Sequence, residues 1–290
     1  MSMATKSIIV ENLTYSYGNL LAVDHINFDV GQGEILGFLG PNGAGKTTTV
    51  KMLTGQLLPK DGRATLLGYD VARQTMEVQS RIGVCFEQTN LYEQMSAVDN
   101  LSLFAELFGV RDFDGYALLK RVGLSGREKD KVSGYSKGMK QRLMIARSMV
   151  NRPEILFMDE PTSGLDPVSA EAIRHIIMEE RDRGATVFLT THDMWEADKL
   201  CDRVAFMESG RIAALDTPHS LKQHYGKRSL IAEVASPDGQ LNRREIALDT
   251  DDTVHAIQDM FGSGKVVTMH SEEATLEDIF IQITGRRLSE

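Results

Sequence analysis

Eight consecutive residues near the start of the chain, Gly40-Pro41-Asn42-Gly43-Ala44-Gly45-Lys46-Thr47, follow the pattern G-x-x-x-x-G-K-[ST]. They come after a short apolar run at 34–39 and before a stretch at 46–53 that is expected to open a helix. Glycines allow successive backbone N–H groups to point into such a turn, Lys46 adds a positive charge, and Thr47 adds a hydroxyl that can bind Mg²⁺. A pattern this long arises by chance in roughly one chain of this size in a hundred. The segment therefore predicts a phosphate-binding loop between a strand and a helix.

The composition of the chain is that of a globular protein. Its 290 residues are 42% apolar and 25% charged, enough for one large domain and a smaller one. No apolar run approaches the roughly 18 residues that cross a bilayer, and the first residues carry no secretory signal. The two cysteines, Cys85 and Cys201, form no CxxC pair, which predicts a reducing, cytosolic compartment and no structural zinc. The net charge of −9 argues against a nucleic-acid partner.

Short strands are predicted on both sides of the glycine-rich loop. Ile26, Phe28 and Val30 alternate with polar residues, which is the period-2 pattern of a half-buried strand. Residues 63–86 read as short strands around a helix, with the last strand at 81–86. The first part of the chain is therefore expected to be rich in strands.

From about residue 96 to residue 150 the pattern becomes helical. Ser96 and Asp99 predict a capping box ahead of one helix, and apolar residues at helical spacing predict a second helix from 138 to about 150. An all-helical subdomain is therefore expected at about 89–151, inserted into an α/β chain.

Strands and helices alternate again after this insert. Strands are predicted at 155–158 and 186–190, and helices after the N-cap residues Asp166 and Asp193. A hairpin at 204–215 is expected to close this part of the chain. The first domain is therefore predicted to cover residues 1–224.

A small separate domain is predicted at 225–290. Its last helix is expected to begin with a capping box formed by Thr275 and Asp278. Its other elements are strands near 229–235, 244–248 and 265–269 and helices near 252–261 and 275–284.

Two carboxylates, Asp159 and Glu160, end the apolar strand at 155–158. A carboxylate in this place can hold Mg²⁺, and the next one can polarise a water that attacks a terminal phosphate. Two acids at a strand end are more often only a solvated end. Beside a phosphate-binding loop, the catalytic interpretation is the better one.

The order of these motifs resembles the nucleotide-binding subunit of ATP-binding-cassette (ABC) transporters over roughly residues 8–224. Residues 40–47 look like the Walker A loop of that family, and residues 155–160 look like its Walker B strand. The resemblance implies that this loop and Thr48 bind ATP, that Lys46 assists catalysis, and that Glu160 is the catalytic base. It implies a P-loop NTPase core with an N-terminal antiparallel β subdomain, an all-helical signature subdomain and a small α+β C-terminal domain.

Four further positions match smaller motifs of the family. Tyr17 stands where the family stacks an aromatic ring on adenine, Gln88 matches the Q-loop glutamine, and His192 matches the switch histidine. Asp166 ends the D-loop segment 163–166 and is expected to couple the two subunits of a dimer. Each residue also has a purely structural interpretation. Tyr17 can be a core-facing strand residue, and Gln88 a polar loop residue. His192 can be a neutral histidine bonded to a carbonyl, and Asp166 a simple N-cap.

The signature segment departs from the family pattern Leu-Ser-Gly-Gly-Gln. It reads Tyr135-Ser136-Lys137-Gly138-Met139. Ser136 and Gly138 keep a hydroxyl and an N–H at a helix N-terminus, where anions bind well, and the resemblance implies that they contact the ATP held by an opposite subunit. Lys137 replaces a glycine, and we hypothesise that its side chain stays outside the phosphate pocket. Ser136 can equally be a plain N-cap, and both roles are compatible.

The resemblance implies an Mg²⁺-dependent ATPase that works as a dimer. Thr47, Gln88 and Asp159 are the expected Mg²⁺ ligands or sensors. The dimer is expected to be a homodimer, or a heterodimer with a similar ATPase, and to sandwich ATP. Separate transmembrane permease subunits are the expected partners, with the chain on the cytoplasmic face of the membrane.

The end of the chain carries a finer resemblance. Residues 274–280 and 284–286 look like the ending of ATPases in the drug- and lipid-exporter branch, although a capped amphipathic helix would give a similar pattern. A soluble ABC ATPase acting on ribosomes or DNA is the alternative. It fits less well, because this chain has one cassette and no coiled coil between Lys46 and Ser136. A metabolic kinase fits neither the signature segment nor His192.

Overall fold

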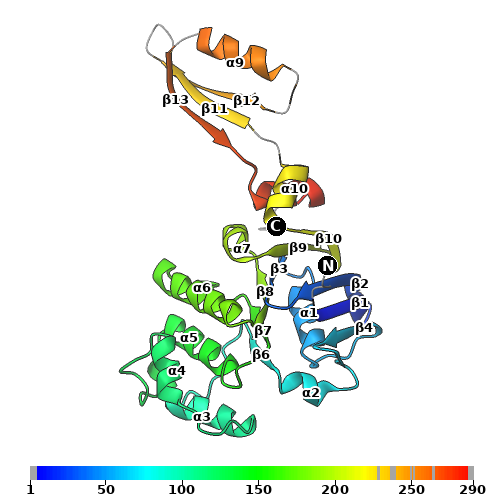
Figure 1. The fold of residues 1–290 in the computed structure, drawn as a ribbon, viewed down its shortest axis with the longest axis vertical. Coiled ribbons are helices and arrows are strands. Elements are labelled where there is room, and N and C mark those ends of the chain that lie inside the picture. Colours follow the sequence, from blue (N-terminus) through cyan, green and yellow to red (C-terminus); the bar gives the residue numbers. More distant parts are fainter. Residues whose placement is uncertain are drawn as a thin grey trace. The chain divides into compact units, whose positions relative to one another are not determined.

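A computed structural model describes residues 5–226, 229–235, 240–248, 250, 252–262 and 265–286, which form two compact units (Figure 1). The first unit extends to Leu215 and the second begins at Asp216. This division comes earlier in the chain than the predicted boundary between 224 and 225. The reason is helix α8 (Pro218–Tyr225), which packs against α10 (Leu276–Thr284) within the second unit.

A six-stranded sheet forms the centre of the first unit, in the order β10-β9-β3-β8-β7-β6. Strands β3, β7 and β8 are buried throughout, as expected for parallel strands covered on both faces. The β7–β8 ladder ends with Asp159 opposite Thr190, so functional groups at these strand ends share one edge of the sheet. The strands are β3 (Ile35–Leu39), β6 (Ile82–Cys85), β7 (Ile155–Asp159), β8 (Thr186–Thr191), β9 (Arg203–Glu208) and β10 (Arg211–Asp216).

A second, antiparallel sheet has the order β2-β1-β4-β5. A cluster of phenylalanines joins it to the central sheet: the rings of Phe28 and Phe38 are 5.1 Å apart, and those of Phe38 and Phe188 are 4.9 Å apart. Such ring pairs stabilise a core beyond the area that they bury. The strands are β1 (Lys6–Tyr17), β2 (Leu20–Gly31), β4 (Asp61–Leu66) and β5 (Tyr69–Asp70), followed by helix α2 (Thr75–Gln79).

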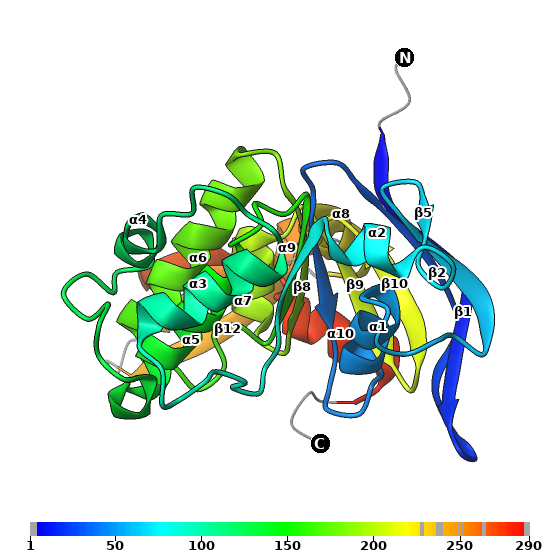
Figure 2. The same ribbon diagram turned by 90° about the horizontal axis from the view of Figure 1, so that it is seen from below.

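The helices between residues 97 and 148 lie on the other side of the central sheet from β1 and β2 (Figure 2). The predicted all-helical region holds α3 (Ala97–Leu107), α4 (Gly115–Arg121), a 3₁₀ turn at Val132–Gly134 and α5 (Lys137–Ser148). Ser96 caps α3, but the predicted capping box is not complete. Asp99 Oδ2 accepts from the Ser96 hydroxyl at 2.6 Å rather than from its backbone N–H.

Three more helices complete the first unit. Helix α1 (Lys46–Leu53) has the predicted bounds, and α6 (Pro167–Asp182) and α7 (Met194–Leu200) begin after the predicted N-caps Asp166 and Asp193. Helices α6 and α7 pack on β8. Among the described residues, no helix is both long and apolar enough to cross a bilayer.

The second unit has a three-stranded antiparallel sheet in the order β12-β11-β13. Helix α9 covers one face of it through a small apolar cluster that includes Met260 and Ala232. The predicted capping box of Thr275 and Asp278 is confirmed. Helix α8 was not predicted, although Thr217 followed by Pro218 is an ordinary start signal. The elements are β11 (Ser229–Ala235), β12 (Leu241–Ala247), α9 (Thr253–Gly262) and β13 (Lys265–Glu272).

Candidate functional site

The glycine-rich loop 40–47 links the end of β3 to the start of α1. A Cβ atom on Gly40 would lie 2.2 Å from the carbonyl oxygen of Met207, and one on Gly45 would lie 2.5 Å from that of Ala22. Both positions therefore exclude any side chain, whereas the space beside Gly43 is open. The loop borders a cavity lined by Tyr17, Leu20, Ala22, Pro41, Asn42, Gly43, Ala44, Gly45, Lys46, Thr47, Thr48, Glu87 and Glu160.

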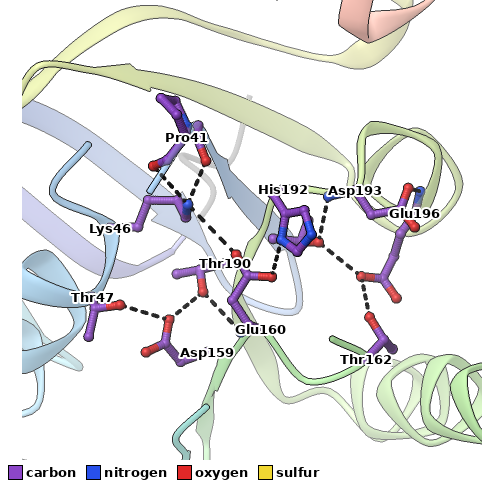
Figure 3. Close-up of polar contacts among 12 residues, drawn as sticks. Pro41, Lys46, Thr47, Asp159, Glu160, Thr162, Thr190, His192, Asp193 and Glu196 are labelled. Atoms are coloured by element: carbon purple, nitrogen blue, oxygen red, sulfur yellow. Dashed lines mark hydrogen bonds and ion pairs between the residues drawn. The ribbon is translucent and has the colours of Figure 1, made fainter. Parts of the chain in front are cut away.

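Lys46 is buried at the base of this loop. Its Nζ donates to the carbonyl oxygens of Gly40 at 2.5 Å and Pro41 at 3.2 Å (Figure 3). It also lies 3.7 Å from Oε1 of Glu160. Burial lowers the pKa of Lys46, while the charges of Glu160 and Asp159 oppose that shift. The loop and the end of β7 thus meet at one ammonium group.

Asp159 collects hydroxyl groups at the end of β7. Its Oδ1 accepts from Thr190 Oγ1 at 2.5 Å and from Thr47 Oγ1 at 3.4 Å. Thr47 comes from the first turn of α1 and Thr190 from β8, so three separate elements converge here. A carboxylate beside a hydroxyl is a donor set of oxygens only, the kind that Mg²⁺ prefers.

Glu160 is held by both its backbone and its side chain. Its backbone has a left-handed φ of 49°, and its N–H lies 3.1 Å from both the carbonyl and the hydroxyl oxygen of Thr190. Oε2 of Glu160 lies 2.8 Å from Nδ1 of His192. Oε1 is buried and has no hydrogen-bond partner among the described residues. A carboxylate oxygen is thus available beside Lys46 and the loop.

Tyr17 and Gln88 differ in where they lie. Tyr17 lines the cavity, is 45% exposed, and contacts Tyr15 edge to face at 4.9 Å between ring centroids. Gln88 is exposed on the segment after β6 and does not line the cavity, but its neighbour Glu87 does. Glu87 was not among the predicted site residues, because a glutamate next to the Q-loop glutamine belongs to no motif.

The signature segment lies beside the D-loop segment of the same chain. Ser136 caps α5 by accepting from the N–H of Met139 at 3.2 Å. A Cβ on Gly164 would lie 2.3 Å from Nζ of Lys137, and one on Gly138 would lie 3.0 Å from Oγ of Ser169. Residues 136–138 are not among those that line the cavity at loop 40–47. Within one chain, the signature segment therefore lies apart from the cavity at loop 40–47.

Asp166 is a well-formed N-cap. Its Oδ1 accepts from the N–H of Ser169 at 2.9 Å. Hydrogen bonds from the side chain and backbone of Ser169 lower the pKa of Asp166. Because Ser169 also faces Gly138, the cap lies close to the signature segment.

Glu196 is a second acid that no motif predicted. It lies on α7, is fully buried, and accepts from the hydroxyls of Thr162 and Thr191. Its place one helical turn after His192 was the available signal, and a glutamate at that spacing reads as an exposed helix residue.

Several relatives of this chain are named as ATP-binding proteins of export or resistance systems. A profile of the ABC transporter family matches residues 23–163. A fluoroquinolones export ATP-binding protein of Mycobacterium tuberculosis is 45% identical over 99% of this chain and 96% of its own length. A linearmycin resistance ATP-binding protein of Bacillus subtilis is 34% identical over 96% of this chain and 98% of its own. A Nod factor export ATP-binding protein of Burkholderia orbicola is 35% identical over 99% and 100%.

Solved structures confirm the predicted α/β P-loop fold. An ATP-binding subunit of an ABC transporter matches with a TM-score of 0.70 and 29% identity, over 75% of this chain and 92% of that one. A dimeric ATP-binding cassette in a post-hydrolysis state, bound to ADP and Pi, matches with a TM-score of 0.66 and 25% identity, over 72% and 98%. The relatives that match over nearly their whole length and the solved structures that share the fold agree on the family of this chain. The chain belongs to the ABC transporter family, as one of its ATP-binding, ATP-hydrolysing subunits.

Proposed function

We propose that this chain hydrolyses ATP at a site shared by two ATPase subunits, and that this reaction powers export through separate membrane subunits. The observation that carries the proposal is that Glu160 lies between Lys46 and His192, with Lys46 and Glu160 in the wall of the cavity at loop 40–47. The reaction is ATP + H₂O → ADP + phosphate. Glu160 orients the attacking water and takes its proton, and Lys46 stabilises charge on the transferring oxygens. His192 holds the Glu160 carboxylate and contacts the γ-phosphate.

The oxygens of Thr47 and Asp159 fit Mg²⁺. They lie 3.4 Å apart at the mouth of the loop, and both belong to the hard-oxygen class of ligand. When bound, Mg²⁺ neutralises charge on the phosphate oxygens. Gln88, which is exposed on the segment after β6, is proposed as an outer contact of this site.

The second half of the site comes from another subunit. Ser136 and Gly138 stand at the N-terminus of α5, where a hydroxyl and backbone N–H groups favour an anion. The dimeric arrangement of the solved cassette bound to ADP and Pi supports this assembly. Either a second copy or a similar ATPase serves as the partner, and Asp166 couples the two through the D-loop. Tyr17 stacks on adenine.

The membrane partner docks on the face that carries β6 and α3. A cavity of about 280 Å³ opens there, with Phe86, Phe104 and Phe108 in its wall. Arg147 stacks over Phe104 at 4.6 Å and donates to the carbonyl of Asn90 at 2.7 Å. An apolar wall with a fixed polar rim suits an amphipathic helix, and Gln88 lies on the segment between β6 and this rim. The chain accordingly works on the cytoplasmic face of the membrane, and residues 216–286 form an accessory domain.

Capture of the partner tests this proposal. A tagged full-length chain is added to detergent-solubilised membranes with ATP, and bound proteins are identified by mass spectrometry. We expect a multi-spanning membrane protein, and we expect Phe104→Asp to release it while basal ATP hydrolysis is kept. Recovery of ribosomes or DNA in its place would favour the soluble class of ABC ATPase.

A further inference from the structure

A fully buried carboxylate lies behind the Glu160–His192 pair. Oε2 of Glu196 accepts from Thr162 Oγ1 at 2.9 Å and from Thr191 Oγ1 at 3.2 Å. Thr162 follows Glu160 by two residues, and Thr191 directly precedes His192. One carboxylate oxygen therefore joins the segments that leave β7 and β8 (Figure 3).

The start of α7 places Glu196 at this junction. Oδ1 of Asp193 accepts from the N–H groups of Trp195 and Glu196, both at 3.0 Å. The N–H of Asp193 donates in turn to Thr191 Oγ1 at 3.0 Å. The Thr191 hydroxyl thus accepts from the helix cap and donates to Glu196. These two hydrogen bonds restrain the Thr191 side chain and the backbone next to His192.

Burying the Glu196 carboxylate in this way lowers the stability of the folded chain. Oε1 of Glu196 has no hydrogen-bond partner among the described residues, and Nη1 of Arg174 stays 3.6 Å away. Arg174 is itself engaged elsewhere, with Glu171 at 2.7 Å and over the ring of Trp195 at 5.2 Å. A buried ion pair with poor geometry does not repay its desolvation. Replacing such a pair by an apolar side chain is often neutral or stabilising, so the contacts of this carboxylate point to a role other than stability.

We infer that Glu196 is a positioning residue for ATP hydrolysis, which ties Thr162 to Thr191 so that Glu160 and His192 meet. The β7–β8 ladder ends at Asp159 and Thr190, and the N–H of Glu160 still donates to the carbonyl of Thr190. Farther along the chain, the Glu196 carboxylate joins Thr162 to Thr191. Glu196 touches neither Glu160 nor His192 and acts through their neighbours. The inference rests on the roles proposed above for those two residues.

A second buried acid offers a matched control. Glu180, near the end of α6, is 1% exposed, and its carboxylate pairs with Arg121 and Arg183, both at 2.6 Å. It is as deeply buried as Glu196, but its carboxylate pairs with these arginines and not with Thr162 or Thr191. A structural defect alone should therefore look the same at both positions.

A double-mutant cycle on the full-length chain tests the inference, with kcat and KM for ATP measured by phosphate release. We expect Glu196→Ala to lower kcat about tenfold with KM within about twofold, because small displacements of reacting groups cost rate rather than binding. Glu196→Gln should recover most of kcat, since its amide oxygen still accepts from both hydroxyls. In a His192→Ala background, Glu196→Ala should cost less than about twofold. Glu180→Ala should lower the melting temperature yet keep the same effect on kcat in both backgrounds.

The outcomes distinguish the positioning role of Glu196 from the roles proposed for Glu160 and His192. Equal losses from Glu196→Ala in both backgrounds would refute the positioning role and leave the site assignment intact. Full turnover by His192→Ala would refute the proposed role of His192 itself. Should Glu196→Ala fail to fold, Thr191→Val removes one hydroxyl without changing shape and should give the same loss of kcat. Wild-type kcat in Thr191→Val would overturn the inference.

Discussion

Nδ1 of His192 lies 2.8 Å from Oε2 of Glu160, although 32 positions separate the two residues in the chain. Parallel pairing of β7 with β8 brings the ends of both strands to one edge of the sheet. The left-handed backbone of Glu160 then turns its side chain across toward β8. The carboxylate is restrained on one oxygen by His192, and the other oxygen faces Lys46.

Replacing Glu160 by glutamine should separate ATP binding from hydrolysis. The amide keeps the shape of the side chain but cannot take a proton from water, so we expect kcat to fall by roughly a hundredfold or more while ATP still binds. Dimers should accumulate with ATP and Mg²⁺, which size-exclusion chromatography detects. Normal turnover in this variant would show that Glu160 is not the base.

Removing the ring of Tyr17 should weaken nucleotide binding. Tyr17 lines the cavity and is 45% exposed, so its ring is available to a base. Stacking is worth about 1–3 kcal/mol per base, and Tyr17→Ala should therefore raise the Kd for ATP about tenfold. Tyr17→Phe keeps the stacking surface and serves as the control. Equal loss in both variants would mean that the hydroxyl matters rather than the ring.

Lys137→Gly should leave ATP-dependent dimerisation unchanged. Nζ of Lys137 lies against Gly164 in the D-loop segment, which supports a side chain that stays outside the phosphate pocket. Glycine at this helix position costs under about 1 kcal/mol. The comparison is made in the Glu160→Gln background, with Lys140→Gly as a second lysine on the same helix. Dimers formed by Lys137→Gly but not by its parent would disprove the hypothesis.

The stability of the chain should depend on pH through Glu196. Burial raises its pKa above the ordinary 4.5, and the hydroxyls of Thr162 and Thr191 partly oppose this. The folded chain holds that proton more tightly than the unfolded chain, so this contribution is full below the unfolded pKa and is lost as pH rises through the folded pKa. Glu196→Gln cannot ionise there. Its melting temperature should rise relative to wild type as the pH increases above about 4.5, and parallel curves would contradict this.

Both cysteines should resist thiol reagents in the folded chain. Burial raises the pKa of Cys85 to about 12 and also raises that of Cys201. Reagents such as a maleimide need the thiolate and access to it. Labelling at neutral pH should begin only after denaturant is added, when both residues react. Rapid labelling of Cys85 without denaturant would mean that β6 opens from the core.

Much of the fold could be predicted from local patterns. Helix α1 has the predicted bounds, and Asp166, Asp193 and Thr275 cap helices where expected, because a cap is a contact over a few residues. Helix α8 was missed, although Thr217 and Pro218 give an ordinary start signal. The predicted capping box at Ser96 is incomplete, because Asp99 Oδ2 accepts from the Ser96 hydroxyl and not from its backbone N–H.

The motifs could be recognised in the sequence, but the full set of residues around the site could not. Matching positions indicated Gln88, whereas the cavity has Glu87 in its wall. The local pattern makes Glu196 read as an exposed helix residue, because its partners Thr162 and Thr191 come from other elements. Which side chains share a space depends on strand register and on the backbone angle at single residues such as Glu160.

The sequence by itself determined the phosphate loop and its lysine. Gly43 and Gly45 have positive φ angles of 82° and 106°, so the motif reflects a local backbone requirement that can be recognised from the sequence. Only the tertiary structure decided which acid meets which base. The contacts of Glu160 with His192 and of Lys137 with Gly164 join distant segments, and parallel strands and packed helices, not spacing along the chain, bring those segments together.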